Sequence, residues 1–300
     1  MGMKLLCILH VLLLLAAVLP ICRAWTPTPD HRLRPKVRTS ITNLNLAPQQ
    51  LGFFEALDFD REKTLERVVR LESYLSSSHF VPYDEGWQRQ KDLWQAHADR
   101  LQNKNDNGSP SSSSSFGTND GCDTIIMLQH EPVFTLGTAS DESFIHGNTD
   151  ASIPVQRINR GGEVTYHGPG QLTVYPVLDL RNYRQDIHWY IRALEEVVIR
   201  ALAEVGVPDA TRDDETTGVW VQNHKVAAVG VHARKWITQH GLAINVTPES
   251  LKPFTEIVPC GLHGRSVGCV QQFSSNTVSV DDMAEAVSVA LEEVFCIELQ

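Results

Sequence analysis

Hydrophobic positions recur along this chain with two different periods, which predict helices in some segments and strands in others. Apolar residues three and four positions apart predict amphipathic helices in residues 60–75, 85–103, 189–206 and 281–296. Gly206 and Pro208 end the third of these helices, and Asp281 lies near the cap of the last.

The strand-like segments are shorter and richer in β-branched residues. They are bounded by turn-forming residues and cover residues 123–130, 172–180, 217–222, 225–233 and 241–246. Helices combined with a sheet of this size predict an α+β fold.

One segment breaks this alternation. Residues 103–121, NKNDNGSPSSSSSFGTNDG, are rich in serine, asparagine and glycine and offer almost nothing to bury. We predict a disordered insertion here and not a domain boundary, so residues 55–300 form one catalytic domain.

The N-terminal residues have a targeting composition. Residues 1–24 combine a basic start, a long apolar run and a small-residue site before Trp25, which is typical of a cleaved signal peptide. Residues 25–54 carry several arginines and hydroxyl residues against a single acid, which is typical of a transit segment. A membrane anchor for the first segment and a flexible secreted N-terminus for the second stay open as alternatives.

Composition narrows the function classes. The chain has 300 residues, of which 42% are hydrophobic, and a formal net charge of −10, which argues against binding to a nucleic acid backbone. Cys7 and Cys22 fall in the predicted signal peptide, and the remaining cysteines are scattered without the spacing of a disulfide framework or a zinc site. A reducing compartment therefore fits best, and no metal is expected.

The candidate chemistry begins with residues 160–176, RGGEVTYHGPGQLTVYP. Glycines let the backbone approach a ligand closely, while Tyr166 and His167 offer a ring and a titratable donor, so the stretch is interpreted as a binding loop. It lacks the dinucleotide-binding and phosphate-loop patterns. A tight structural turn with an exposed histidine is the alternative.

A second candidate is Cys260, which lies between Pro259 and Gly261 in IVPCGLHGRS. A nearby ammonium group, for which Lys225 is the candidate, would favour the thiolate that acyl transfer requires. The alternative is a small buried hydrophobic side chain, the commoner fate of a free cysteine.

Several motifs in order carry a family resemblance. The pattern RGGxxTYHxxGQxxxYP is preceded by YDEGWQRQ and LQHEPVFTLG and followed by KVAAVGV, HGLAIN and IVPCG. From Tyr83 to Phe295 the chain resembles the lipoyl(octanoyl) transferase family. The resemblance implies a biotin/lipoate ligase-type catalytic domain, with a mixed β-sheet flanked by helices.

The resemblance also implies roles for individual residues. Cys260 would be the acyl-accepting thiol and Lys225 the lysine that activates it. The residues that would contact the acyl chain are Arg160, Gly161, Gly162, Glu163, Val164, Thr165, Tyr166, His167, Ala228, Val229, Gly230, Gly241, Leu242 and Ala243. The implied reaction moves an octanoyl group from octanoyl-acyl carrier protein to a lysine of a lipoyl domain and needs no cofactor.

The implied acceptors are lipoyl domains of 2-oxoacid dehydrogenase complexes or the glycine cleavage H protein. No nucleic acid partner and, after processing, no stable membrane association are expected. An ATP-dependent lipoate-protein ligase and a non-catalytic binding protein for the carrier or the lipoyl domain are the alternatives.

The chain departs from the family pattern at Val267-Gly268-Cys269-Val270 and in its serine-rich insertion. The two-part presequence predicts a plastid address, with the mitochondrion as the alternative.

Overall fold

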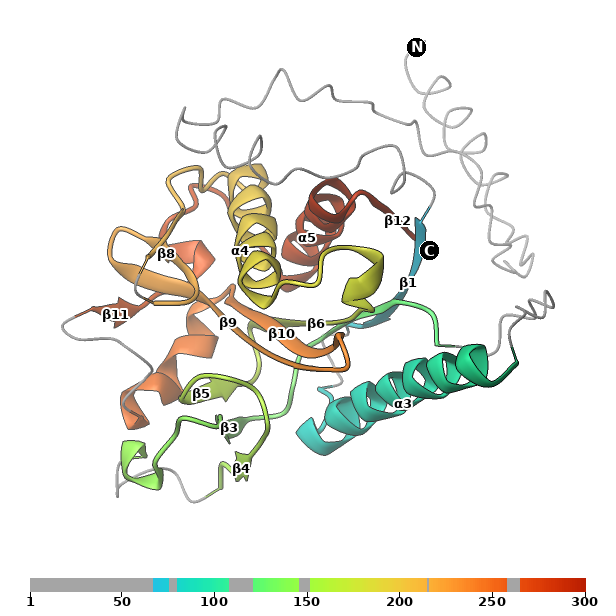
Figure 1. Ribbon diagram of the computed structural model, residues 1–300. Coiled ribbons are helices and arrows are strands. Elements are labelled where there is room, and N and C mark those ends of the chain that lie inside the picture. The colour runs from blue at the N-terminus through green and yellow to red at the C-terminus, as the bar shows by residue number, and fades with distance from the viewer. Residues whose placement is uncertain (1–66, 76–79, 108–120, 146–151, 215, 258–264) are drawn as a thin grey trace, which may run out of the picture. The chain divides into compact units, whose positions relative to one another are not determined.

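The computed structural model describes residues 67–75, 80–107, 121–145, 152–214, 216–257 and 265–300, all within a unit that spans Pro48–Gln300. The predicted signal and transit segments lie outside the described residues, as do Cys260 and most of the serine-rich insertion. In the described part, the polypeptide forms two sheets and three α-helices (Figure 1).

The larger sheet contains nine strands among the described residues, in the order β12-β1-β2-β6-β10-β9-β8-β7, with β11 paired to β9. Their bounds are β1 Arg67–Tyr74, β2 Thr124–Leu128, β6 Gln171–Val177, β7 Thr211–Arg212, β8 Val219–Val221, β9 His224–Arg234, β10 Ile237–Asn245, β11 Ser266–Val267 and β12 Ile297–Leu299. The β1 strand is parallel to both of its neighbours, whereas the run from β2 through β7 is antiparallel. The sheet is therefore mixed, as predicted.

Helices cover both faces of this sheet. In β2, Ile125 and Met127 join the main hydrophobic cluster with helices α4 (Ile187–Glu204) and α5 (Val280–Phe295). Ile126 and Leu128 belong instead to the cluster that contains residues of helix α3 (Tyr83–Asn107). Because successive strand residues point to opposite faces, α3 packs on the face away from α4 and α5. Figure 1 shows this arrangement.

The smaller sheet supplies a second layer on the α3 side. It consists of β3 (Val133–Leu136), β4 (Val155–Arg157) and β5 (Val164–His167), and it lies below the main sheet in Figure 1. Phe134, Tyr166 and Ile257 form its buried cluster, and the 3-10 helix η4 (Pro248–Glu256) contributes Phe254. The space between the two sheets contains the cavity described below.

Local capping explains where the predicted helices begin and end. The Asp186 side chain accepts a hydrogen bond from Trp189 N at the start of α4, and Gly206 adopts a φ of 85° just beyond its end. Ser279 caps α5, because its side chain accepts from Asp282 N while Asp282 returns a bond to the Ser279 backbone, and Asp281 lies near this cap as predicted. The three predicted helices at 85–103, 189–206 and 281–296 are thus confirmed.

The helix predicted for residues 60–75 is wrong. Residues 67–74 form β1, which pairs with β2 on one side and β12 on the other, and residues 60–66 lie outside the described part. Val69 and Leu71 alternate toward the main core, whereas Val68 is 41% exposed. Valine favours strands, and two partner strands are available to pair with this segment. These two factors outweigh the helical spacing of its apolar residues, because a helix here would have no surface to pack against.

Other differences concern elements that the sequence left as loops. The five predicted strands are present as β2, β6, β8, β9 and β10, but β3, β4, β5, β7, β11 and β12 were not predicted. Residues 160–176 are mostly strand, because β5 and β6 flank a short turn at residues 168–170. Helix α3 continues to Asn107, so the first residues of the predicted insertion are helical.

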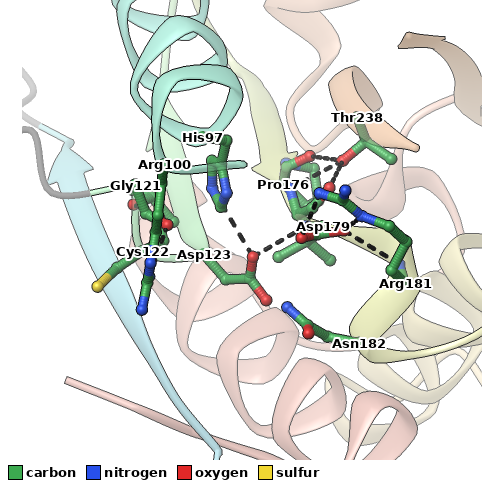
Figure 2. A network of polar contacts seen from close by, with 12 residues as sticks. His97, Arg100, Gly121, Cys122, Asp123, Pro176, Asp179, Arg181, Asn182 and Thr238 are labelled. Carbon is green, nitrogen blue, oxygen red and sulfur yellow. Dashed lines mark hydrogen bonds and ion pairs between the residues drawn. The ribbon is translucent and has the colours of Figure 1, made fainter. Parts of the chain in front are cut away.

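A buried polar junction ties α3 to the sheet (Figure 2). The Asp123 carboxylate accepts hydrogen bonds from Asp179 N and the Tyr183 hydroxyl, both at 2.9 Å, and its Oδ1 lies 3.7 Å from His97 Nε2. Burial raises the pKa of Asp123 and lowers the pKa of His97. The junction therefore fixes the start of β2 against α3 and the segment after β6.

Within the described residues, no helix combines the length and apolar character needed to cross a bilayer.

Candidate active site

The floor of the cavity is built from three neighbouring antiparallel strands. Their register places Gly230 opposite Gly241 and Ala228 opposite Ala243, and it places Thr173 of β6 opposite Ala243. Directly opposed residues in an antiparallel pair point to the same face. A row of small side chains therefore leaves a shallow apolar trough on the face of the sheet that looks toward β5.

The roof is the segment from Arg160 to Glu163 together with β5. Gly161 N donates to the Val231 carbonyl at 3.0 Å, which attaches this segment to β9. A Cβ atom on Gly230 would lie 3.1 Å from the Gly161 carbonyl oxygen and 3.2 Å from Arg160 Cδ. Glycine at 230 therefore allows the roof to approach the floor this closely.

Floor and roof enclose a cavity of about 260 Å³. One end is lined by Lys225, Thr217, Asn245 and Val267, and the other by Tyr83, Arg160, Tyr175 and His240. The pairing of β9 with β10 shows that these two ends lie at opposite ends of the strands. Ala227 lies opposite Ile244 near the Lys225 end, and Val231 lies opposite His240 near the other end. The cavity therefore runs along the strands from Lys225 to His240.

Lys225 is held at the start of β9 by its surroundings. A Cβ atom on Gly218 would lie 2.5 Å from Lys225 Cε, so glycine makes room for the lysine side chain, and Gly218 adopts a φ of 130°. The backbone N–H of Gly218 donates to the buried Glu195 carboxylate at 2.8 Å. The Lys225 ammonium also lies 5.4 Å from the centre of the Trp220 ring.

The segment that contains Cys260, residues 258–264, lies outside the described residues, but both flanks are fixed. Ile257 is buried beside Phe134 and Tyr166. Arg265 Nη1 donates to Asp213 Oδ2 at 2.6 Å, and its guanidinium lies 3.4 Å from the centre of the Trp220 ring. Two residues later, Val267 pairs with Lys225 in the parallel β9–β11 contact. The flank that follows Cys260 in the chain therefore runs beside Lys225.

A hydrogen-bonded row of rings lies beside the far end of the cavity. His130 Nδ1 contacts the Val81 carbonyl at 2.8 Å, and because a carbonyl only accepts, Nδ1 carries the proton. His130 Nε2 therefore accepts from the Tyr175 hydroxyl at 2.7 Å, and Tyr175 in turn bonds Tyr83. Burial lowers the pKa of His130 to about 4 and raises the pKa values of both tyrosines.

A second polar chain crosses the floor. His167 Nδ1 donates to Gln171 Oε1 at 2.8 Å, and Gln171 Nε2 donates to Asn245 Oδ1 at 3.0 Å. Asn245 Nδ2 continues the chain to the Gly268 carbonyl at 3.1 Å. These bonds connect β5, β6 and β10 to the segment that follows β11.

The histidines around the cavity are neutral. Burial lowers the pKa of His167 well below its usual value, with His130 and Arg160 adding to the shift. Burial and the Arg160 charge lower the pKa of His240 to about 3. Arg160 itself is buried and donates from Nη2 to the Thr135 carbonyl at 3.0 Å and to Thr135 Oγ1 at 2.9 Å. A buried cation beside these imidazoles disfavours their protonation.

Comparison with known proteins decides the family. Residues 113–292 match the lipoyl protein ligase A/B catalytic domain. The chain belongs to this family. It is 46% identical over 192 residues to the chloroplastic octanoyltransferase LIP2p2 of Arabidopsis thaliana, a match that covers 64% of this chain and 63% of that protein. It is 44% identical over 197 residues to the octanoyltransferase of Synechococcus sp. (strain WH7803), covering 65% of this chain and 74% of that protein.

A solved structure supports the fold assignment. The chain superposes on a bi-partite lipoate protein ligase of Thermoplasma acidophilum with a TM-score of 0.53 and 18% sequence identity, over 79% of this chain and 86% of that chain. At this identity the likeness concerns the fold alone. The predicted mixed sheet with flanking helices is therefore confirmed as the lipoate ligase catalytic fold.

Of the predicted site residues, Cys260 lies outside the described residues, and the others lie together with one exception in orientation. Lys225 lines the cavity with Arg160–Thr165, His167, Ala228–Gly230 and Gly241–Ala243. Tyr166 points away, into the cluster with Phe134, and its ring packs edge-on against Phe254 at 5.9 Å. Tyr166 thus supports β5 from behind. The roles of all these residues in substrate binding stay predictions.

Sequence reasoning missed the residues at the far end of the cavity. Tyr83, Tyr175 and His240 line it, and His130 lies directly behind Tyr175. Tyr83 and His130 lie in motifs that were used only to recognise the family, whereas Tyr175 and His240 lie in motifs in which only other residues were assigned roles. Strand alternation from Gln171 through Thr173 to Tyr175 was the available signal. Among the described residues, no group of histidine, cysteine, aspartate or glutamate side chains is arranged to hold a metal ion.

The buried neutral histidines predict a loss of stability in acid. His130 and His240 have folded-state pKa values of about 4 and about 3, below an unfolded value near 6.5, so the unfolded chain binds protons first as the pH falls. Their contribution is complete above pH 6.5 and is lost below it. At pH 5 each histidine lowers the free energy of unfolding by on the order of 2 kcal/mol.

Urea denaturation at pH 7 and pH 5 measures this loss. The pH dependence should become smaller in His130→Gln and stay unchanged in the exposed control His188→Gln. Equal pH dependence in wild type and His130→Gln would contradict the prediction.

Proposed function

We propose that this protein is an octanoyltransferase that moves an octanoyl group from octanoyl-acyl carrier protein to a lysine of a lipoyl domain. One observation carries the proposal: an apolar trough, floored by paired glycines and alanines, ends beside Lys225. An eight-carbon chain has no polar groups to satisfy beyond its carbonyl, so it fits the row of glycines and alanines. The Gln171 and Asn245 side chains of the floor are hydrogen-bonded to one another. The octanoyltransferase names of the Arabidopsis and Synechococcus relatives support the same reaction.

The reaction consists of two acyl transfers. In the first, the Cys260 thiolate attacks the thioester carbonyl, a new sulfur–carbon bond forms, and the carrier thiolate leaves. In the second, the neutral amine of the acceptor lysine attacks the acyl-enzyme, the bond to Cys260 breaks and an amide forms. The proton released by the amine balances the one that the departed carrier thiolate takes up, so Cys260 ends the cycle as a thiolate again. Lys225 is a group on the described flank that can relay this proton.

Two charges have defined tasks in this mechanism. The Lys225 ammonium stabilises the Cys260 thiolate, which is the attacking species in the first step and the leaving group in the second. Arg160 is occupied with the Thr135 carbonyl and hydroxyl and the Gly161 carbonyl, so it holds the roof in place. The neutral histidines add no net charge to the trough, which keeps it suited to a hydrocarbon chain.

The proposed donor and acceptors follow from the same chemistry. Octanoyl-acyl carrier protein supplies the activated thioester, so the reaction needs no ATP, which distinguishes it from that of a ligase. Lipoyl domains of 2-oxoacid dehydrogenase complexes or the glycine cleavage H protein supply the lysine. The work on the Thermoplasma ligase includes its E2 lipoyl domain, which supports acceptors of this class.

We expect a covalent octanoyl adduct on Cys260 when the mature domain is incubated with octanoyl-acyl carrier protein without ATP. Intact-mass spectrometry followed by peptide mapping measures it. The adduct should be absent in Cys260→Ser and present in Cys269→Ser, because Cys269 is fully buried. Acylation of Cys122, Cys269 or Cys296 in place of Cys260 would show that the nucleophile is misassigned, and a requirement for ATP would favour a ligase.

Lys225 should control the reactivity of Cys260. In Lys225→Ala, alkylation of Cys260 by iodoacetamide should slow at neutral pH by about tenfold and much less at alkaline pH, where the thiolate forms without help. Lys252→Ala, at an exposed lysine, is the matched control. If wild type and Lys225→Ala give the same pH profile of alkylation, Lys225 has no influence on the thiol.

We also propose that the protein acts in a plastid. Residues 1–54 have the composition of a signal peptide followed by a transit segment. The chloroplastic Arabidopsis relative and the cyanobacterial one support this address. A fluorescent fusion of residues 1–54 in an alga with a complex plastid should label that plastid, and removal of residues 26–54 should leave the label in the endoplasmic reticulum. Mitochondrial or secreted fluorescence from the full presequence would exclude this address.

A further inference from the structure

Three buried nitrogens without a hydrogen-bond partner lie where α3 packs against His240, the residue at the far end of the cavity. They are Trp87 Nε1, Gln90 Nε2 and His240 Nδ1. Trp87 and Gln90 lie one turn apart on α3, and Gln90 Oε1 accepts a hydrogen bond from His240 N at 2.6 Å. The rings of Trp87 and His240 are 6.4 Å apart. The three nitrogens therefore belong to one contact between α3 and β10.

The hydrogen-bonding character of this cluster follows from its other bonds. His240 Nε2 lies 2.8 Å from Asn159 Oδ1, an acceptor, so Nε2 carries the proton and Nδ1 presents a lone pair. The Trp87 and Gln90 nitrogens can only donate. Two donors and one acceptor are the complement of a water molecule or a hydroxyl group.

The backbone holds His240 in this place. His240 has a φ of 58°, in the left-handed region, which a non-glycine residue adopts only when its surroundings require it. Its N–H bonds to Gln90 and its ring bonds to Asn159 fix it from both sides. His240 also lines the cavity, so it forms the boundary between the apolar trough and the polar cluster.

The position of this boundary matches the length of an octanoyl chain. From Asn245, beside Lys225, to Gly241 the trough spans four residues of β10, roughly 14 Å at the rise of an antiparallel strand. The carbonyl and the thioester sulfur occupy the first part of that span. Seven carbon–carbon bonds in a zigzag add roughly 9 Å, given bonds of about 1.5 Å. The terminal methyl therefore reaches Gly241 and stops at His240.

We propose that Trp87, Gln90 and His240 form a polar end stop that sets the acyl chain length. The inference rests on the octanoyl transfer proposed above. It further states what the end stop binds, which is one water-sized molecule or one hydroxyl substituent. A longer alkyl chain would place methylene groups against two donors and an acceptor and leave all three unpaired. Unpaired buried polar groups cost more than the burial of two further methylenes contributes, so longer chains are rejected.

Rates of transfer from acyl carrier protein thioesters of three chains test the end stop. The chains are octanoyl, decanoyl and 8-hydroxyoctanoyl, whose hydroxyl reaches the cluster. Wild type should prefer octanoyl to decanoyl by about tenfold or more in kcat/KM and should accept 8-hydroxyoctanoyl about as well as octanoyl. Equal use of octanoyl and decanoyl, or strong rejection of 8-hydroxyoctanoyl, by wild type would overturn the proposal.

Two conservative variants test the roles of the two donors separately. Trp87→Phe removes one donor and keeps a ring, and Gln90→Met removes the other and keeps the length of the side chain. Each should lower the octanoyl-to-decanoyl ratio by about fivefold and should lower the relative rate with 8-hydroxyoctanoyl. Trp94→Phe is the matched control on the same helix, because Trp94 Nε1 donates to the Arg234 carbonyl, outside the cluster. Its ratios should equal those of wild type.

The outcomes separate this proposal from the function beneath it. If wild type transfers no acyl group of any length, the proposed octanoyl transfer fails and the end stop fails with it. If wild type transfers octanoyl but Trp87→Phe and Gln90→Met slow every chain equally, the cluster is only structural, and the end stop fails while the proposed function stands.

Discussion

The antiparallel pairing of β9 with β10 is the contact on which the site depends. Its register places glycine opposite glycine and alanine opposite alanine. A slip by one residue would turn the side chains of Val229 and Leu242, which pack in the main core, into the trough. The same pairing carries Lys225 to one end of the trough and His240 to the other. Pocket shape, pocket length and the position of the charged group are therefore consequences of one hydrogen-bonding ladder.

The second constraint is electrostatic. The roof residue Arg160 brings a guanidinium into a region that also contains His167 and His240, and the result is a cation surrounded by carbonyls, hydroxyls and neutral imidazoles. The Thr135 carbonyl and hydroxyl accept hydrogen bonds from Arg160, so oriented dipoles contribute to stabilising this guanidinium beside the hydrocarbon site.

The sequence predicted the elements with strong local patterns and the residues in recognisable motifs. Residues 189–206 and 281–296 have a full apolar stripe and a cap, and both are helices in the structure. Residues 60–75 show the limit of this reasoning. Leu71 and Leu75 have a helical spacing, whereas Val69 and Leu71 have the spacing of a strand, and only the distant partners β2 and β12 decide between the two. His240 shows the same limit within the site, because its left-handed backbone and its contacts with Gln90 and Asn159 join segments far apart in the chain.

The position of β1 in the middle of a parallel trio has a consequence for how the protein becomes folded. Its outer neighbour, β12, is made long after β1, and two backbone bonds, Leu71 N to the Gln300 carbonyl and Gln300 N to the Val69 carbonyl, join them. Such contacts between sequence-distant segments form late and slowly. While the chain is still emerging from a ribosome, β1 can pair with β2 on one edge, but its other edge is exposed because β12 has not yet been made. The edge of β1 that pairs with β12 therefore stays open until β12 has appeared, so this side of the sheet is the last to be completed.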